Sequence, residues 1–164
     1  MRTAIFIDGG YLQKVVPTKV DYQALRRELG GEQARMFFYD CLPEEANGKR
    51  DFLHALKCMG VTVRLGELEE IGPPKYFGDH SNIVQKGVDV QMALDVVEAA
   101  QQGMERIVVI TGDADLVPAI LKARDLMAWV VLVHNTFVAK SLWACVDERV
   151  QMDWVWQKKV ERQQ

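Results

Sequence analysis

The sequence predicts an α/β protein, a three-layer α/β/α sandwich built on a central parallel sheet of about five to six strands. Two observations support this fold class. Strand-like and helix-like segments alternate along the chain, and each strand-like segment is a short apolar run rich in β-branched or aromatic residues. Such runs are typical of parallel strands buried on both faces. Strict alternation implies right-handed crossovers, which place helices on both sides of the sheet.

The elements follow in order. Apolar runs predict five buried strands, at Ala4–Ile7, Ala34–Tyr39, Val61–Leu65, Ile107–Ile110 and Trp129–Val133. Apolar residues at helical spacing predict helices between them, at Tyr22–Leu29, Lys49–Met59, Val88–Gln101 and Leu116–Met127. A shorter helix near Ser141–Val146 and an edge strand around Met152–Trp156 complete the pattern.

The segment Gly66–Gln85 breaks the alternation, because no helical or strand period holds across it. Segments of this length without regular structure are often functional lids or arms. The alternative is a surface hairpin or excursion with no role in the chemistry. Because the segment leads directly to Asp89, we keep both interpretations open.

Length and composition predict one domain over residues 1–156, followed by a polar tail at 157–164. No apolar run approaches the length of a membrane span, and the segment MRTAIFIDGG lacks the features of a secretory signal. We therefore expect a cytoplasmic protein. The three cysteines are far apart, without metal-binding spacing, which predicts reduced thiols rather than disulfides or a zinc site.

The net charge of -3 excludes the dominant basic field typical of a constitutive, high-affinity nucleic-acid binder. It does not exclude an enzyme that holds phosphates locally. Acidic groups that bind divalent cations become neutral or positive once occupied. Metal occupancy would therefore set the local sign of the charge.

Three aspartates follow predicted buried strands. Asp8 ends the run IFID, and Asp113 and Asp115 follow the strand before TGDADL. In open α/β sheets, ligands bind at the carboxyl ends of strands, so these positions suit reactive groups. The alternatives are a turn residue for Asp8 and a helix N-cap for Asp115. Converging carboxylates are stabilised by a hard cation, which predicts a site for Mg²⁺ or Mn²⁺.

A fourth aspartate, Asp89, lies on a predicted helix. Positions four, seven and eleven residues further on are Ala93, Val96 and Ala100, so we expect its carboxylate to point inward. The alternative is an acid that stabilises a helix N-terminus. Asp95 shares its stripe with polar residues and is predicted to lie on a solvated face, outside the site.

Four ordered motifs, IDGG, KGVDVQMALD, TGDADLVP and SLWACVDERVQMD, resemble the pattern of NYN domains. These belong to the PIN-like metal-dependent nucleases. The resemblance covers nearly the whole chain and implies a Rossmann-like fold with an acidic pocket that binds Mg²⁺ or Mn²⁺. The family's acidic positions fall on four residues that would be both catalytic and metal-binding: Asp8, Asp89, Asp113 and Asp115.

One departure concerns the residue three positions after the first aspartate. Many family members have Asn there, whereas this chain has Tyr11. The tyrosine hydroxyl reaches farther than an amide, so activity or substrate shape could differ. Substrate-binding roles are also predicted for Lys86, Thr111 and Ser141, against the alternative that these are a solvated lysine and ordinary turn or cap residues.

The resulting prediction is a ribonuclease that hydrolyses phosphodiester bonds with one or two metal ions. RNA, single-stranded or structured, enters as the substrate by resemblance. The serious alternative is a catalytically silent RNA-binding or assembly module on the same fold. A phosphatase of the haloacid dehalogenase type would need a second acid two residues after Asp8, where Gly10 stands. A homodimer is a further option, because four tryptophans gather in the last third of the chain.

Overall fold

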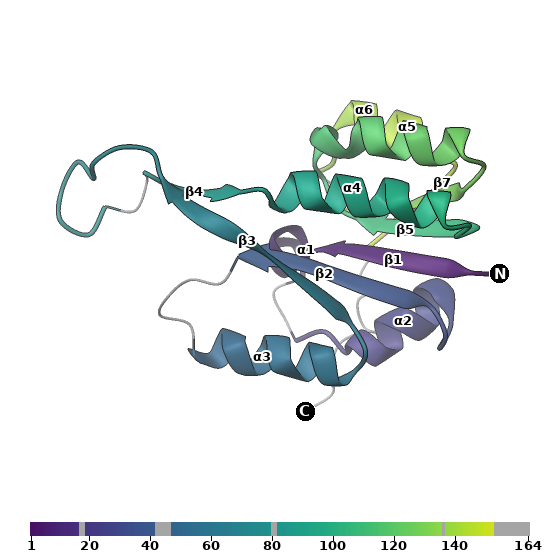
Figure 1. Ribbon diagram of the computed structural model, residues 1–164, viewed down its shortest axis with the longest axis horizontal. Helices are drawn as coiled ribbons and strands as arrows, with labels where there is room; N and C mark the ends of the chain where they lie inside the picture. Colours follow the sequence, from purple (N-terminus) through teal and green to yellow (C-terminus); the bar gives the residue numbers. More distant parts are fainter. Residues whose placement is uncertain (17–18, 42–46, 80–81, 136, 153–164) are drawn as a thin grey trace.

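The computed structural model describes residues 1–16, 19–41, 47–79, 82–135 and 137–152. A seven-stranded sheet runs through the molecule in the order β4-β3-β2-β1-β5-β6-β7. Helices cover both of its faces, and one long hairpin leaves the body (Figure 1). The predicted three-layer α/β/α sandwich is confirmed. The strands are β1 (Thr3–Asp8), β2 (Arg35–Cys41), β3 (Thr62–Glu70), β4 (Ile83–Lys86), β5 (Arg106–Ile110), β6 (Trp129–His134) and β7 (Glu148–Gln151).

The first strand lies at the centre of the sheet, between β2 and β5, and pairs in parallel with both. Asp8 lies opposite Tyr39 of β2, while Ile7 lies opposite Ile110 of β5. The carboxyl ends of these three strands therefore meet at one edge of the sheet. Asp8 and the residue after Ile110 are neighbours in space although they are far apart in sequence.

Alternate residues of β1 enter two separate cores. Phe6 packs on the side of α4, α5 and α6, whereas Ile5 and Ile7 pack on the side of α1, α2 and α3. All three side chains are fully buried, as expected for a central parallel strand. The helices are α1 (Gly9–Val15), α2 (Tyr22–Gly30), α3 (Asn47–Cys58), α4 (Val88–Gln101), α5 (Val117–Asp125) and α6 (Lys140–Cys145), with a 3₁₀ turn η1 (Ala114–Leu116) before α5.

The helix α1 was not among the predicted elements. Its sequence starts with Gly9 and Gly10, which have low helix propensity and argue against a helix. Asp8 offsets this cost by capping the helix, because its side chain accepts a hydrogen bond from the backbone N–H of Tyr11. Glycine is also required at position 9, where a Cβ would lie 2.8 Å from the carbonyl oxygen of Tyr39.

The predicted edge strand at Met152–Trp156 was misplaced. The edge strand β7 occupies Glu148–Gln151 and pairs in parallel with β6 from Val131 to His134. Met152 lies just beyond it, buried, with its backbone N–H bonded to the carbonyl of His134 at 2.7 Å. An edge strand needs only one apolar face, so its polar sequence gave a weak signal. Residues 153–156 and the predicted tail 157–164 lie outside the described residues.

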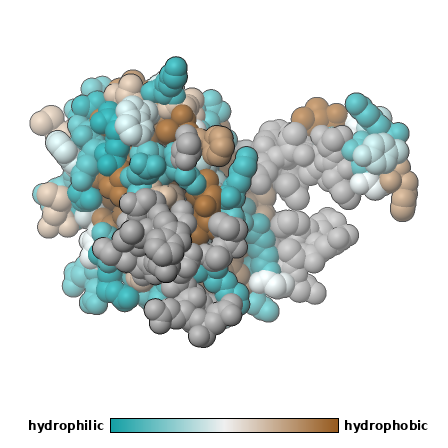
Figure 2. Space-filling view, turned by 180° about the vertical axis from the view of Figure 1, so that it is seen from behind, coloured by the Kyte–Doolittle hydropathy of each residue, from teal (hydrophilic) through white to brown (hydrophobic). Residues whose placement is uncertain are grey.

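The segment Gly66–Gln85 forms most of a β-hairpin. Strand β3 runs on to Glu70 and pairs antiparallel with β4, with Glu67 opposite Lys86 and Glu70 opposite Ile83. We call residues 66–86 the arm, which projects clear of the body (Figures 1 and 2). Tyr76 and Phe77 near its end are 68% and 106% exposed. The segment is therefore a hairpin, and any role that it has in the chemistry stays a prediction.

Candidate metal centre

Asp8 stands at the end of β1 with both carboxylate oxygens engaged. Its Oδ1 accepts the hydrogen bond from the Tyr11 backbone N–H at 3.1 Å, and its Oδ2 accepts one from the Thr111 hydroxyl at 3.2 Å. Thr111 is fully buried, and its Oγ1 also accepts from the backbone N–H of Asp113 at 3.2 Å. The hydroxyl of Thr111 therefore links two acidic positions that different strands supply.

Asp113 and Asp115 lie in the turn that connects β5 to α5. Asp113 caps η1, and its Oδ1 accepts a hydrogen bond from the backbone N–H of Asp115 at 2.9 Å. The sequence had suggested Asp115 as the N-cap. The cap falls two residues earlier because a 3₁₀ turn precedes α5, which itself begins at Val117. The side chain of Asp115 is thereby released from capping and is exposed.

Asp89 completes a cluster of three. One carboxylate oxygen from each of Asp89, Asp113 and Asp115 lies within 4.8 Å of the other two. The predicted inward orientation of Asp89 was wrong, because its side chain is exposed. Val96 and Ala100 on the same stripe are buried, as predicted. Asp89 sits in the first turn of α4, so it reaches the other two acids instead of the core.

The charges of the cluster oppose one another. Desolvation by the neighbouring groups raises the pKa of Asp89 from its ordinary value of 3.8 to about 6, and the charges of Asp113, Asp8 and Asp115 add to the increase. Burial also raises the pKa of Asp8, although hydrogen bonds from Tyr11 and Thr111 oppose the shift. Three hard oxygen donors that repel one another at this separation fit a divalent cation such as Mg²⁺ or Mn²⁺.

Asp8 is outside the group of three, although it borders the cluster. The hydroxyl of Thr111 stands between Asp8 and the backbone of Asp113, and the charge of Asp8 contributes to the raised pKa of Asp89. The structure thus brings Asp89, Asp113 and Asp115 together directly and places Asp8 beside them. A direct metal contact by Asp8 stays a prediction.

The remaining residues that were predicted to bind substrate differ in their surroundings. Tyr11 is tied to protein groups, because its hydroxyl accepts from the backbone N–H of Asn135 at 2.8 Å and donates to the carbonyl of Phe137 at 3.5 Å. Ser141 is exposed in the first turn of α6. Lys86 is the last residue of β4, and its side chain lies outside the described part of the structure.

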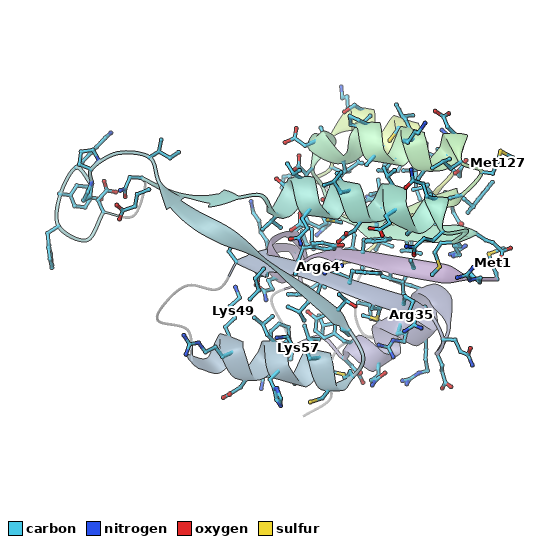
Figure 3. The ribbon with its side chains drawn as sticks, in the orientation of Figure 1. Met1, Arg35, Lys49, Lys57, Arg64 and Met127 are labelled. Atoms are coloured by element: carbon cyan, nitrogen blue, oxygen red, sulfur yellow. The ribbon has the colours of Figure 1, made fainter. Side chains whose placement is uncertain are left out.

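Asp95 does not lie on a solvated face, contrary to prediction. Its Oδ2 accepts hydrogen bonds from the Tyr39 hydroxyl at 2.7 Å and from Nε of Arg64 at 3.1 Å. Arg64 reaches it from β3, below α4 (Figure 3). This ion pair joins α4 to the sheet. Asp95 is correctly absent from the acidic cluster, but it has a structural partner rather than water.

Sequence reasoning missed one acid near the site, Asp40. It is buried at the end of β2, where its Oδ2 lies 2.7 Å from Nζ of Lys49 on α3 and its charge raises the pKa of Asp8. The run FFYDC has the same form as IFIDG, an apolar strand ending in an acid, so the signal was present. The ion pair with Lys49 partly neutralises the negative charge of Asp40 near the end of β2.

Two cavities adjoin the cluster. One, of about 460 Å³, is lined by Asp8 and Asp113 together with Tyr11, Lys14 and Phe137. The other, of about 520 Å³, is lined by Asp89 and Asp115 with apolar residues of α4 and α5. Each of the two grooves therefore has two of the four aspartates in its lining.

A parallel α/β/α sandwich with converging acids at its strand ends is the class of protein that this fold and site define. The NYN domain model matches residues 2–153, and the chain belongs to the NYN domain family. The crystal structure of Acinetobacter baumannii MurG is similar over 93% of this chain, with a TM-score of 0.51 and 11% sequence identity. This chain spans 42% of that protein, and the similarity concerns the fold alone.

A comparison with curated proteins gave no match. Within the described ranges, the helices are too short or too polar to cross a membrane.

Proposed function

We propose that this protein is a metal-dependent ribonuclease that hydrolyses RNA phosphodiester bonds. One observation carries the proposal: in a chain of the NYN family, carboxylate oxygens of Asp89, Asp113 and Asp115 converge within 4.8 Å at the strand ends. The raised pKa of Asp89 supports it, because desolvation and the neighbouring charges of Asp113, Asp8 and Asp115 disfavour its ionised form when no cation is bound. Mg²⁺ or Mn²⁺ is the proposed cofactor.

The acidic residues and Thr111 would have different roles. Asp89 and Asp115 offer exposed carboxylates, whereas the Asp113 carboxylate is held by the hydrogen bond that its Oδ1 accepts from the backbone N–H of Asp115. Thr111 and Asp8 fix the turn that carries Asp113. A bound Mg²⁺ or Mn²⁺ would supply a more acidic water and neutralise charge on the phosphoryl oxygens. The protein's own contribution is to hold the hard oxygens in place before the substrate arrives.

The test is cleavage of end-labelled single-stranded and structured RNA in Mn²⁺, Mg²⁺ or EDTA. Asp89→Asn and Asp113→Asn should each lower the rate by at least about 100-fold, because each removes a proposed metal ligand. Glu98→Gln is the matched control, since Glu98 is an exposed acid on the same helix as Asp89. Cutting that persists in EDTA, or that survives both substitutions, would contradict the proposal.

The alternative function is a catalytically silent RNA-binding or assembly module. Tyr11 favours it, because its hydroxyl is bonded to the backbone of Asn135 and Phe137, at a position where many family members have Asn. RNA that binds in the presence of metal and stays uncut would support this alternative. A cytoplasmic location and a homodimer stay predictions.

A further inference from the structure

We propose that the groove between α1 and the loop after β6 holds an unpaired nucleotide of the substrate, next to the bond to be cut. This inference depends on the proposed function, because it assigns a strand-binding subsite to the same centre. The groove has a volume of about 460 Å³. Asp8 and Asp113 belong to its lining, so the groove is adjacent to the acidic residues of the candidate metal centre.

One wall of the groove carries an aromatic ring with no cover. The side chain of Phe137 is 81% exposed, although its backbone is held in place. Its carbonyl accepts the Tyr11 hydroxyl at 3.5 Å and lies so close to Gly112 that a Cβ there would be 2.9 Å away. A large apolar ring on a fixed backbone gains nothing for the fold by facing water. It offers a flat face on which a base can stack.

The lining of the groove also includes a positive charge. Lys14 lies on α1, is exposed, and makes no ion pair with any other described residue. Its ammonium group is therefore available for a phosphate oxygen. An aromatic ring and a lysine in one groove are the combination that binds single strands, because the ring stacks on the base and the cation binds the phosphate backbone.

The groove lined by Asp89 and Asp115 lacks both features. Its lining of Val90, Leu94, Pro118 and other small or acidic residues includes neither an aromatic ring nor a cation. The two grooves are thus chemically different, and the strand is assigned to the one that contains Phe137 and Lys14. A base inside a duplex is already stacked on both faces, so binding to Phe137 requires an unpaired nucleotide.

The experiment measures binding by fluorescence anisotropy of a fluorescein-labelled 12-nucleotide single-stranded RNA and of a blunt duplex of the same sequence. Ca²⁺ supplies a cation for oxygen ligands, and gels verify that the RNA stays intact. The variants are Phe137→Ala, Phe137→Trp and Lys14→Gln. Phe77→Ala, at the end of the arm, and Lys57→Gln, on α3 (Figure 3), serve as matched controls. Thermal melting establishes that each variant is folded.

Phe137→Ala is expected to weaken binding of the single strand by about five- to one hundredfold, while duplex binding changes little. Phe137→Trp should restore the affinity, because tryptophan retains a stacking face. Lys14→Gln should lower the slope of log Kd against log salt by about 0.7, which corresponds to one lost phosphate contact. The two control variants should bind as the native chain does.

Unchanged binding of the single strand by Phe137→Ala would overturn the proposal, as would equal losses for single strand and duplex. Absence of RNA binding by the native chain would also overturn it. Cleavage in Mn²⁺ is measured separately. If the native chain cuts RNA and Phe137→Ala binds RNA as the native chain does, the proposed function holds and this subsite is excluded. If RNA binding depends on Phe137 but the native chain does not cut RNA, the subsite holds and the proposed function is excluded.

Discussion

The Tyr11 hydroxyl accepts a hydrogen bond from the backbone N–H of Asn135 at 2.8 Å. This contact joins the first helix to the loop after β6, across 124 residues of sequence. The ring of Tyr11 also covers Gly112, in the turn that leads to Asp113. One side chain therefore braces two of the loops that surround the acidic cluster.

Tyr11→Phe should lower the free energy of unfolding by about 1 to 2 kcal/mol, because it leaves the N–H of Asn135 without this acceptor. Urea denaturation would measure the loss. Tyr76→Phe is the control, since Tyr76 is 68% exposed on the arm and its removal of a hydroxyl should cost nothing measurable. Equal stability of the native chain and Tyr11→Phe would show that water replaces the bond.

Gly112→Ala should destabilise the fold by about 1 to 3 kcal/mol through overpacking. A Cβ at this position would lie 2.7 Å from Cε2 of Tyr11 and 2.9 Å from the carbonyl oxygen of Phe137. Gly48→Ala on α3 is the matched control, because no atom lies within 4 Å of the added Cβ. Thermal unfolding of both variants should separate them, and a Gly112→Ala protein as stable as Gly48→Ala would argue against the close contact.

Without a bound cation, the contribution of Asp89 to the free energy of unfolding should fall as pH rises from about 4 to about 6. The folded-state pKa of Asp89 is raised from 3.8 to about 6, so within this window the folded chain holds a proton that the unfolded chain has lost. Asp89→Asn removes the effect. In EDTA it should match the native chain near pH 4 and exceed its stability at pH 7.

The gain from Asp89→Asn at pH 7 should be less than about 1 kcal/mol, because solvent screens the exposed carboxylate. Urea denaturation at several pH values in EDTA would measure it. A stability difference between the two proteins that stays constant from pH 4 to pH 7 would mean that Asp89 has an ordinary pKa.

Binding of Mn²⁺ should weaken as pH falls below about 6. The metal needs deprotonated carboxylates, and the raised pKa of Asp89 places proton competition in this range. Isothermal titration calorimetry should show affinity falling up to about tenfold per pH unit for one competing proton. Asp113→Asn should weaken binding at every pH, whereas Glu98→Gln should leave it unchanged. Affinity that does not vary between pH 5 and pH 7 would exclude this competition.

The sequence predicted the sheet well because central parallel strands are buried on both faces. Runs such as Ile107–Ile110 must be apolar throughout, and the structure has this strand at Arg106–Ile110. Elements that depend on a few local contacts gave weaker signals. The helix α1 depends on a cap by Asp8, and β7 has one neighbour in the sheet.

The prediction of the acidic cluster was limited in a related way. Counting along α4 identified the correct stripe for Asp89 but not how far the neighbouring layers extend along the helix. Exposure of Asp89 depends on where α4 begins relative to the sheet edge, which only the tertiary structure determines. Asp40 was overlooked although the run FFYDC has the same form as IFIDG, and its ion pair with Lys49 of α3 becomes visible only in the structure.

The place of β1 between β2 and β5 has a consequence for the order in which the chain folds during synthesis. One edge of β1 can pair once residues 35–41 have been synthesised, whereas the other edge can pair only after residues 106–110 have been added. The three converging acids come from α4 and from the turn after β5. A nascent chain therefore has no assembled acidic cluster until Asp115 has been added and β5 has docked on β1.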